Sequence, residues 1–304
     1  MYIINHKDTV NILNSGITPI HKLKFNSKQL PPLMTIYGYK DHRYSYTKGT
    51  QKIKLLDMST IEAVLYMKEM YHDDNIMFVN FANEKSRGGK PGMRWNNTNS
   101  YVYAYGNRAY AQEENIIEKS TAYLSLAKIK YPFNSEEICY VSPVEIFATD
   151  HTKSNSILIP ELTRCYMIIS ASENLSYEVL WSPEMKKIIL DKIRKRIRNQ
   201  LIAADKITEI RDTVEKDLNI DNTNKKNILI LGAFGCGAFS PNNWDISNNY
   251  AFAEDVAKLY YDLLNNEWSN SFDEVIFAVP TFGSINPYDK NYMNYMAFGN
   301  IFGF

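Results

Sequence analysis

Two adjacent carboxylates, Glu113 and Glu114, are the residues of this sequence best suited to acid–base chemistry. They follow Gln112 and open a stretch with helical periodicity that continues through Leu124. Two carboxyl groups this close suppress each other's ionisation, so that one of them can stay protonated and act as an acid. The alternative is ordinary helix capping, because acidic side chains are favoured in the first turn of a helix. The pair by itself leaves both interpretations open.

A predicted strand and a glycine loop precede the carboxylates. The apolar run Ile76–Val79 ends in the sequence Asn-Phe-Ala-Asn, which finishes at Asn83, and a basic loop with Gly88 and Gly89 follows. A short apolar run of this kind predicts a buried strand. Ligands of open α/β sheets bind beyond the carboxyl ends of such strands, so we expect Asn83 and the two glycines at the mouth of a site.

A second strand-to-loop transition follows the apolar run Ile228–Leu231. The loop contains Gly235, Cys236, Gly237, Ala238 and Phe239. Glycines let the backbone turn tightly and bring its N–H groups against an oxyanion, although many glycine turns are only tight connections. Cys236 has no histidine near it in the sequence, so a small apolar filler explains it better than a nucleophile does.

Composition excludes several classes of function. The 304 residues carry 34 basic and 34 acidic side chains, so no overall field draws the protein to nucleic acid, and we expect no direct nucleic-acid binding. Three widely spaced cysteines favour neither a disulfide framework nor a zinc site, and the five histidines have no metal-ligand spacing. We expect no metal, a reducing compartment and, without a signal peptide or transmembrane segment, a cytoplasmic protein.

The remaining elements predict one α/β domain with an extension. Residues 1–45 are read as an N-terminal extension with little regular structure that packs on the body, and residues 46–304 as the domain itself. Apolar runs at residues 53–56, 76–79, 144–147, 166–169, 228–231 and 274–279 predict strands. Helical patterns separate several of these runs. One pattern begins at Ser59-Thr60. A basic one spans residues 182–204, where isoleucines recur every four residues with charged residues between them, so we expect the charges to form a solvated helix face. The apolar tail, residues 295–304, should dock on the body.

The motifs together resemble the macrodomain enzymes of the poly(ADP-ribose) glycohydrolase family, particularly its bacterial type. The resemblance rests on the Asn-Phe-Ala-Asn segment, the Gly88-Gly89 loop, the Gln-Glu-Glu sequence at a helix start and the glycine loop of residues 235–239, in that order. It implies a three-layer α/β/α macrodomain with a mostly parallel central sheet, which binds ADP-ribose at the ends of the central strands and needs no cofactor.

The resemblance also implies roles for individual residues. Glu114 would be the general acid/base, and Glu113 would orient the neighbouring ribose. Asn83 would hold the distal ribose, and the loop of residues 235–239 would wrap the diphosphate. The residues expected to bind ligand are Asn83, Gly88, Gly89, Gln112, Gly235, Cys236, Gly237, Ala238 and Phe239.

The implied activity is hydrolysis of ribosyl glycosidic bonds in poly(ADP-ribose) or in protein-linked ADP-ribose. One departure from the family pattern leaves an alternative open. Lys90 stands where the family has a third consecutive glycine, and an insertion through Tyr105 separates the loop from Gln112. A macrodomain reader that binds ADP-ribose without cleaving it is therefore the second candidate. An active enzyme with this insertion is expected to prefer terminal or single ADP-ribose units.

Overall fold

The structure is a computed structural model of the chain. The residues that it describes are 3–4, 34–37, 51–71, 75–88, 93–95, 101–103, 111–150, 156–176, 182–217, 225–241 and 246–304. Gly89, Lys90 and most of the predicted insertion lie outside these residues, as does most of the predicted extension of residues 1–45.

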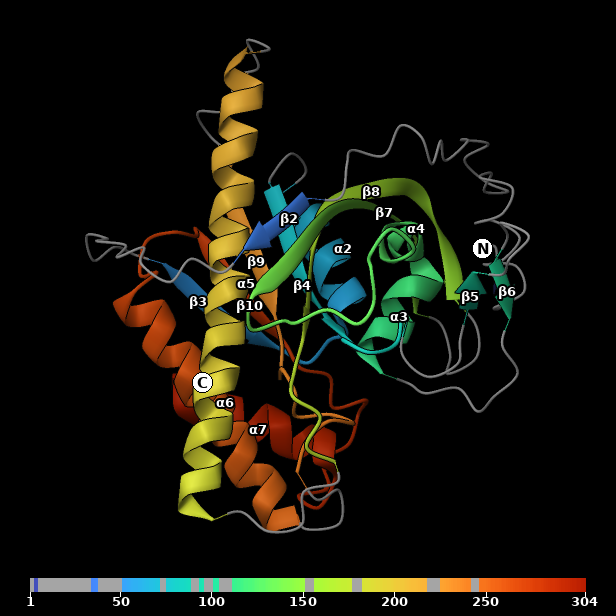
Figure 1. Ribbon diagram of the computed structural model, residues 1–304. Coiled ribbons are helices and arrows are strands. Elements are labelled where there is room, and N and C mark those ends of the chain that lie inside the picture. Colours follow the sequence, from blue (N-terminus) through green and yellow to red (C-terminus); the bar gives the residue numbers. More distant parts are fainter. Residues whose placement is uncertain are drawn as a thin grey trace.

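A mixed sheet forms the centre of the described part of the chain (Figure 1). Its strand order is β2-β7-β8-β4-β9-β10-β3, and β1 pairs with β8. The bounds are β1 Ile3–Ile4, β2 Met34–Tyr37, β3 Lys52–Leu56, β4 Asn75–Ala82, β7 Ile138–Asp150, β8 Ser156–Ala171, β9 Asn227–Leu231 and β10 Glu274–Ala278. The neighbours from β8 through β3 are parallel, whereas β1, β2 and β7 pair antiparallel. The prediction of an α/β fold with a mostly parallel sheet is confirmed.

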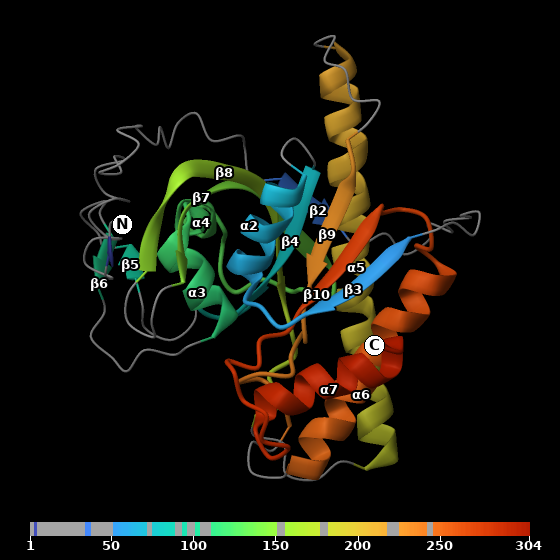
Figure 2. The same ribbon diagram turned by 180° about the vertical axis from the view of Figure 1, so that it is seen from behind.

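Helices cover both faces of this sheet. The bounds are α2 Thr60–Met70, α3 Gln112–Lys119, α4 Ala122–Leu126, α5 Pro183–Asp217, α6 Ile246–Asn266 and α7 Lys290–Phe302. Ile61 of α2 and Ile116 of α3 belong to the apolar core on one face, and Ile193 of α5, Val256 of α6 and Phe298 of α7 belong to the core on the other. Accordingly, α5 lies in front of the strands in Figure 1 and behind them in Figure 2.

The start of α2 follows from its sequence. Ser59 accepts a hydrogen bond from the backbone N–H of Glu62, and the Glu62 carboxylate accepts one from the Ser59 N–H, which completes a capping box. The strand after this helix is longer than predicted: β4 continues past Val79 to Ala82, because Asn80 pairs with Ile169 of β8. Backbone pairing with a neighbouring strand overrides the polar side chain.

The helical pattern that begins at Gln112 is interrupted in the structure. Ser120 is extended, forms a β-bridge with Ile146, and separates α3 from the short α4. The Ser120 hydroxyl donates to the carbonyl of Ile116, and the N–H of Thr121 donates to Glu145 of β7. These bonds replace the helical ones at this point. The predicted single helix is therefore two helices, and the first holds the two glutamates.

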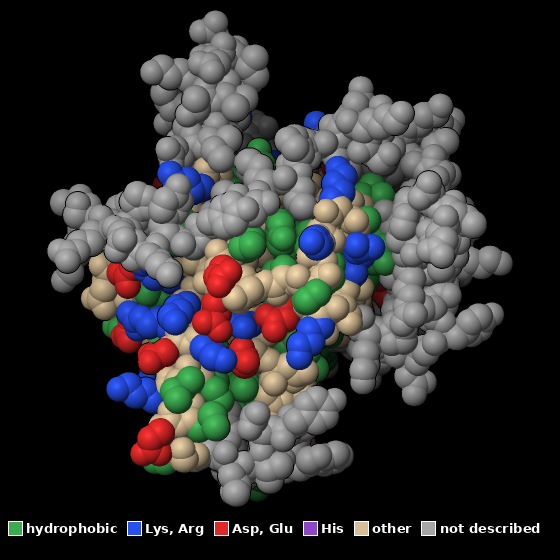
Figure 3. All heavy atoms as spheres, viewed as in Figure 1, with side chains coloured by type: hydrophobic (Ala, Val, Ile, Leu, Met, Phe, Trp, Pro, Cys, Tyr) green, Lys and Arg blue, Asp and Glu red, His purple; other side chains and the backbone are tan. Residues whose placement is uncertain are grey.

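The basic helix is α5, and it extends well beyond the predicted end at residue 204. Its repeating isoleucines, Ile189, Ile193 and Ile197, are buried, as the spacing predicted. Most charges between them face solvent, although Arg196 is buried, and the helix forms surface ion pairs such as Lys186 with Asp255 and Arg198 with Glu267. Basic and acidic side chains are interspersed on this face (Figure 3), which confirms the predicted solvated helix face.

Both ends of the chain join this architecture. The strands β1 and β2 add to the sheet through β8 and β7, which the sequence analysis did not foresee because both strands are short. At the other end, α7 begins at the capping residue Asp289 and buries Ala297 and Phe298. The predicted docking of the apolar tail is confirmed for these residues. A separate antiparallel pair joins β5 Met93–Trp95 and β6 Tyr101–Tyr103.

Candidate active site

The parallel strands bring the predicted residues Asn83 and Gly235, with residues of two further loops, to one edge of the sheet. Asn83 follows β4, Ser172 follows β8, Gly235 lies in the loop after β9, and Thr281 follows β10. Because these strands are parallel, their carboxyl ends lie side by side. The two glycine loops, which are about 150 residues apart in the sequence, therefore belong to one region of the surface.

Gln112 connects the start of α3 to this edge. Its Nε2 donates to Thr60 Oγ1 at 2.9 Å and to the carbonyl of Val79 at 2.7 Å, and its Oε1 accepts from the N–H of Phe81 at 2.6 Å. Both N–H groups of the side chain are thus used within the protein. The Gln112 amide thus links the start of α3 to α2 and to β4.

Glu113 and Glu114 are both buried, with only 2% and 6% of their surfaces exposed. Asn80 Nδ2 donates to Glu113 Oε1 at 3.2 Å. Burial raises the pKa of Glu113 to about 8, and the charge of Glu114 adds to this, while the bonds from Asn80 and from the backbone of Asn83 act in the opposite direction. Glu113 is therefore protonated at neutral pH, as expected for one member of a close carboxylate pair.

The loop after β4 lies against the helix that carries the glutamates. Asn83 Oδ1 accepts from the N–H groups of Lys85 at 2.9 Å and of Ser86 at 3.1 Å, which closes a tight turn and fixes the orientation of the Asn83 amide. Gly88 has a φ of +70°, and a Cβ there would lie 3.0 Å from the ring of Tyr123. Only glycine fits this close approach without strain.

The loop after β9 is tight and held by α7. Gly235 has a φ of +76°, and a Cβ there would lie 2.2 Å from Ser172 Oγ. From α7, Lys290 donates to the carbonyl of Gly237, and Asn294 donates to the carbonyl of Cys236. Gly237 and Ala238 are exposed at the tip, and Phe239, half-buried, accepts from the N–H of Leu175 through its carbonyl.

Some residues near the site were missed or left unassigned by the sequence analysis. Asn80 was seen only as part of a motif, although an amide within an apolar run is itself a signal of a buried polar contact. Tyr131 lies close enough to Glu113 for its charge to raise the pKa of the phenol, after the larger effect of burial, and Arg87 stacks over the ring at 5.5 Å. No pattern in the sequence indicated Tyr131.

Phe282 is a further aromatic residue at the same edge. Its side chain is 68% exposed, directly after Thr281, and its φ of +53° is unusual for a residue other than glycine. Asp57 at the end of β3 holds the preceding residue, because its carboxylate accepts from both the N–H and the hydroxyl of Thr281 at 2.6 Å. An exposed aromatic ring on a strained but anchored backbone is a signal of function rather than of packing.

The three cysteines are buried and free, and burial raises the pKa of each thiol, to about 12 for Cys139. Cys236 is thus a buried thiol and not an activated nucleophile. Within the described ranges, no three His, Cys, Asp or Glu side chains gather as metal ligands, and no helix combines the length and apolar composition needed to cross a bilayer.

A family model matches the first part of the chain. Residues 1–141 match the family model described as microbial-type PARG, catalytic domain. The match begins at residue 1, so it includes the residues set apart above as an extension. No curated protein matches the sequence at a significant level.

Solved structures match over nearly the whole chain. The poly(ADP-ribose) glycohydrolase of Thermomonospora curvata has a TM-score of 0.70 at 20% identity, over 97% of each chain. The Deinococcus radiodurans enzyme in complex with ADP-ribose has a TM-score of 0.57 at 19% identity, over 99% of this chain and 94% of that one. The family match and the shared fold confirm that this chain resembles the poly(ADP-ribose) glycohydrolases of the bacterial type.

Proposed function

We propose that the protein is a poly(ADP-ribose) glycohydrolase that uses Glu114 as its general acid/base. The observation that carries the proposal is the buried pair Glu113–Glu114 at the start of α3, beside the loop of Asn83. The fold supports the proposal as well, since related structures bind ADP-ribose or the inhibitor ADP-HPD. Helices on both faces of the sheet are consistent with a three-layer macrodomain.

The proposed reaction needs one proton donor that later becomes a base. Glu114 protonates the leaving oxygen as the bond between that oxygen and the anomeric carbon of ribose breaks through an oxocarbenium-like state. Water then adds to the carbon and returns its proton to Glu114. The step requires Glu114 in its neutral form, which burial and the negative diphosphate of a bound substrate favour over the carboxylate.

The neighbouring groups fit the parts of ADP-ribose. Glu113, held by Asn80 and protonated at neutral pH, donates a hydrogen bond to a ribose hydroxyl. The amide of Asn83 holds the distal ribose. The exposed tip at Gly237 and Ala238 lets backbone N–H groups approach the diphosphate, and the exposed ring of Phe282 offers a face on which the adenine stacks.

The proposed substrates include protein-linked ADP-ribose as well as the polymer. The second candidate function is a reader that binds ADP-ribose without hydrolysis, and it is favoured only by Lys90 in place of a third glycine. One experiment separates the two. The protein is incubated with poly(ADP-ribose) and with a mono-ADP-ribosylated protein, and released ADP-ribose is measured by mass spectrometry beside calorimetry with free ADP-ribose. Release of ADP-ribose supports the enzyme, and binding without release supports the reader. A protein that neither releases nor binds ADP-ribose would reject both candidates.

A further inference from the structure

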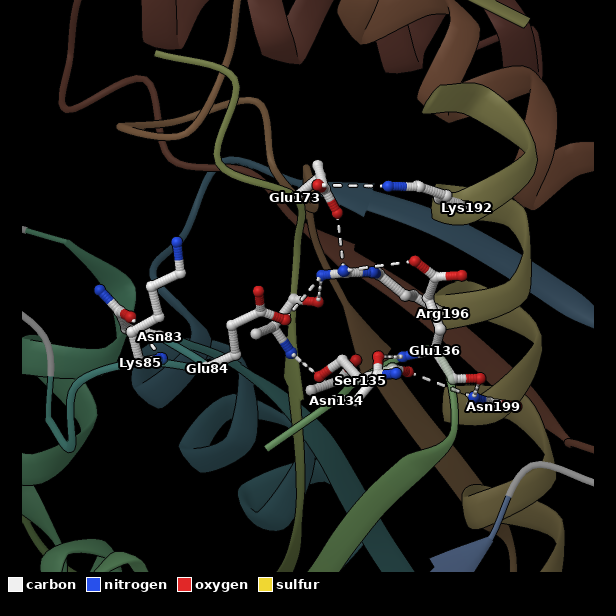
Figure 4. Close-up of polar contacts among 12 residues, drawn as sticks. Asn83, Glu84, Lys85, Asn134, Ser135, Glu136, Glu173, Lys192, Arg196 and Asn199 are labelled. Atoms are coloured by element: carbon white, nitrogen blue, oxygen red, sulfur yellow. Dashed lines mark hydrogen bonds and ion pairs between the residues drawn. The ribbon is translucent and has the colours of Figure 1, made fainter. Parts of the chain in front are cut away.

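The guanidinium of Arg196 lies behind the candidate site and is almost completely buried. Arg196 belongs to α5, on the opposite face of the sheet from α3, and only 2% of it is exposed. Its Nη1 donates to the carbonyl of Ala171 at 2.9 Å. Figure 4 shows this side chain directed from α5 into a group of acidic and amide side chains.

Three carboxylates surround this one cation. Glu173 lies 2.7 Å from Nη2, Glu84 lies 3.3 Å from Nη1, and Glu136 lies 3.8 Å from Nη2. They come from three different segments, which follow β8, follow β4 and precede β7. The planar guanidinium has several N–H groups in a fixed arrangement, so it can bind separate segments at once, which a lysine ammonium cannot do in the same geometry.

Two of these segments carry residues of the candidate site. Glu84 is the neighbour of Asn83, whose turn begins the loop after β4. Ala171 is the neighbour of Ser172, the residue that approaches Gly235 in the loop after β9. Arg196 therefore connects the segment next to the proposed ribose contact with the segment next to the proposed diphosphate contact.

A second set of bonds fixes the same place. The hydroxyl of Ser135 accepts from the N–H of Ala171 at 2.7 Å. Asn199, one turn after Arg196 on α5, donates to the carbonyls of Ser135 at 3.2 Å and of Glu136 at 2.9 Å. The end of β8 is thus held through both its N–H and its carbonyl. The carbonyl of Glu84 accepts from the N–H of Phe133 at 3.0 Å, but Arg196 is the only ion-pair partner of the Glu84 carboxylate among the described residues.

Other basic residues of α5 do not replace Arg196. Lys192 lies 3.6 Å from Glu173 and is partly exposed, and Lys195 lies 3.9 Å from Glu136 and is exposed. Neither reaches Glu84. Burial raises the pKa of Glu84, and the charge of Arg196 opposes this effect. Without the guanidinium, Glu84 would lose the charge that keeps its carboxylate directed toward α5.

We propose that Arg196 is a positioning residue for the active site, which fixes the Asn83 loop relative to the end of β8 and thereby the spacing of the ribose and diphosphate contacts. The assignment rests on the proposed function for the identity of the ligand. Arg196 touches no ligand in this assignment. It acts through Glu84 on one side and through Ala171 on the other.

The test measures the affinity for ADP-ribose and the thermal unfolding midpoint of purified variants. Arg196→Lys keeps the positive charge but loses the planar set of N–H donors. Glu84→Gln keeps the shape of the half-buried side chain but loses its negative charge. The control is Arg198→Lys on the same helix, because Arg198 pairs with Glu267, which directly follows α6. We expect the Kd for ADP-ribose to rise at least tenfold in both test variants and to stay within twofold of the parent in the control.

A structural ion pair without a role in binding gives a different pattern. In that case the midpoints of Arg196→Lys and Glu84→Gln fall, but the Kd of each folded variant equals that of the parent, and the assignment is wrong. The double variant adds a check: if Arg196 acts through Glu84, combining the two substitutions weakens binding by less than the product of the single effects. A parent protein that does not bind ADP-ribose at all would instead overturn the proposed function.

Discussion

Asn80 on β4 and Glu113 on α3 meet through a hydrogen bond of 3.2 Å between Nδ2 and Oε1. The bond links the strand that ends at the candidate site to the helix that carries both carboxylates. An amide donor favours the charged form of Glu113, but burial outweighs it and the pKa rises to about 8. The structure thus holds Glu113 in a fixed orientation in which its neutral form is favoured.

Glu114→Gln should lower the rate of hydrolysis at least about a hundredfold, the lower range for loss of a general acid. Its affinity for ADP-ribose should stay that of the parent. The amide has the shape of the carboxyl group but no proton to exchange. Glu118→Gln, one turn further along α3, is the control. Rates from released ADP-ribose and affinities from calorimetry are compared, and a Glu114→Gln variant as fast as the parent would show that Glu114 is not the acid.

Glu113→Gln should change the pH dependence of stability. The pKa of Glu113 is raised from 4.5 to about 8 in the folded state, so the folded protein binds this proton more tightly than the unfolded chain does. Stability is therefore lost as the pH rises from about 4.5 to about 8. The variant lacks this loss, so its free energy of unfolding should equal that of the parent at pH 4 and exceed it at pH 9 by up to about 5 kcal/mol, the value of such a shift at 1.36 kcal/mol per pKa unit.

Thermal or urea unfolding across this pH range measures the Glu113 effect. Glu161→Gln, at an exposed position of β8, provides the comparison. If the difference between Glu113→Gln and the parent is the same at pH 4 and pH 9, the buried carboxyl group does not titrate in this interval.

Gly235→Val should destabilise the protein by about 1–3 kcal/mol or more and weaken ADP-ribose binding. The φ of +76° strains any other residue, and the added Cβ would collide with Ser172 Oγ. The matched control is Gly237→Ala, whose Cβ would meet no atom within 4 Å and should leave the unfolding midpoint unchanged. The double variant Gly235→Ala/Ser172→Gly should be more stable than Gly235→Ala alone, because the second change removes the side chain that the added Cβ meets. A double variant no more stable than Gly235→Ala would mean that the collision is not the cause.

Phe282→Ala should weaken ADP-ribose binding by about 1–3 kcal/mol, the usual value for one base stacked on an aromatic ring. Ribose 5-phosphate, which has no base, should bind the variant and the parent equally. Ile285→Ala alters another exposed apolar side chain of the same loop and serves as the control. Equal losses for both ligands would place the effect in the backbone of the loop and not in stacking.

Much of the local structure could be predicted from the sequence because it depends on short-range patterns. The capping residue Ser59, the buried isoleucines of α5 and the apolar runs of β4, β9 and β10 follow from side-chain periodicity and hydrogen-bonding capacity. The order of the glycine loops and the glutamate pair was also sufficient to indicate the family resemblance. The errors concern places where distant strands compete with local preference, such as Asn80 in β4 and the break at Ser120.

Residue types and their order were determined by the sequence: two adjacent carboxylates, an asparagine after one strand and glycines after another. Only the tertiary structure decided that Asn80 faces Glu113 and that the Gln112 amide donates a hydrogen bond to the backbone of β4. The same holds for the contacts of Arg196 with Glu84 and Ala171. The physical reason is that burial and pairing depend on which strands become neighbours. The pKa of Glu113 is set by this surrounding protein, which no local pattern of residues specifies.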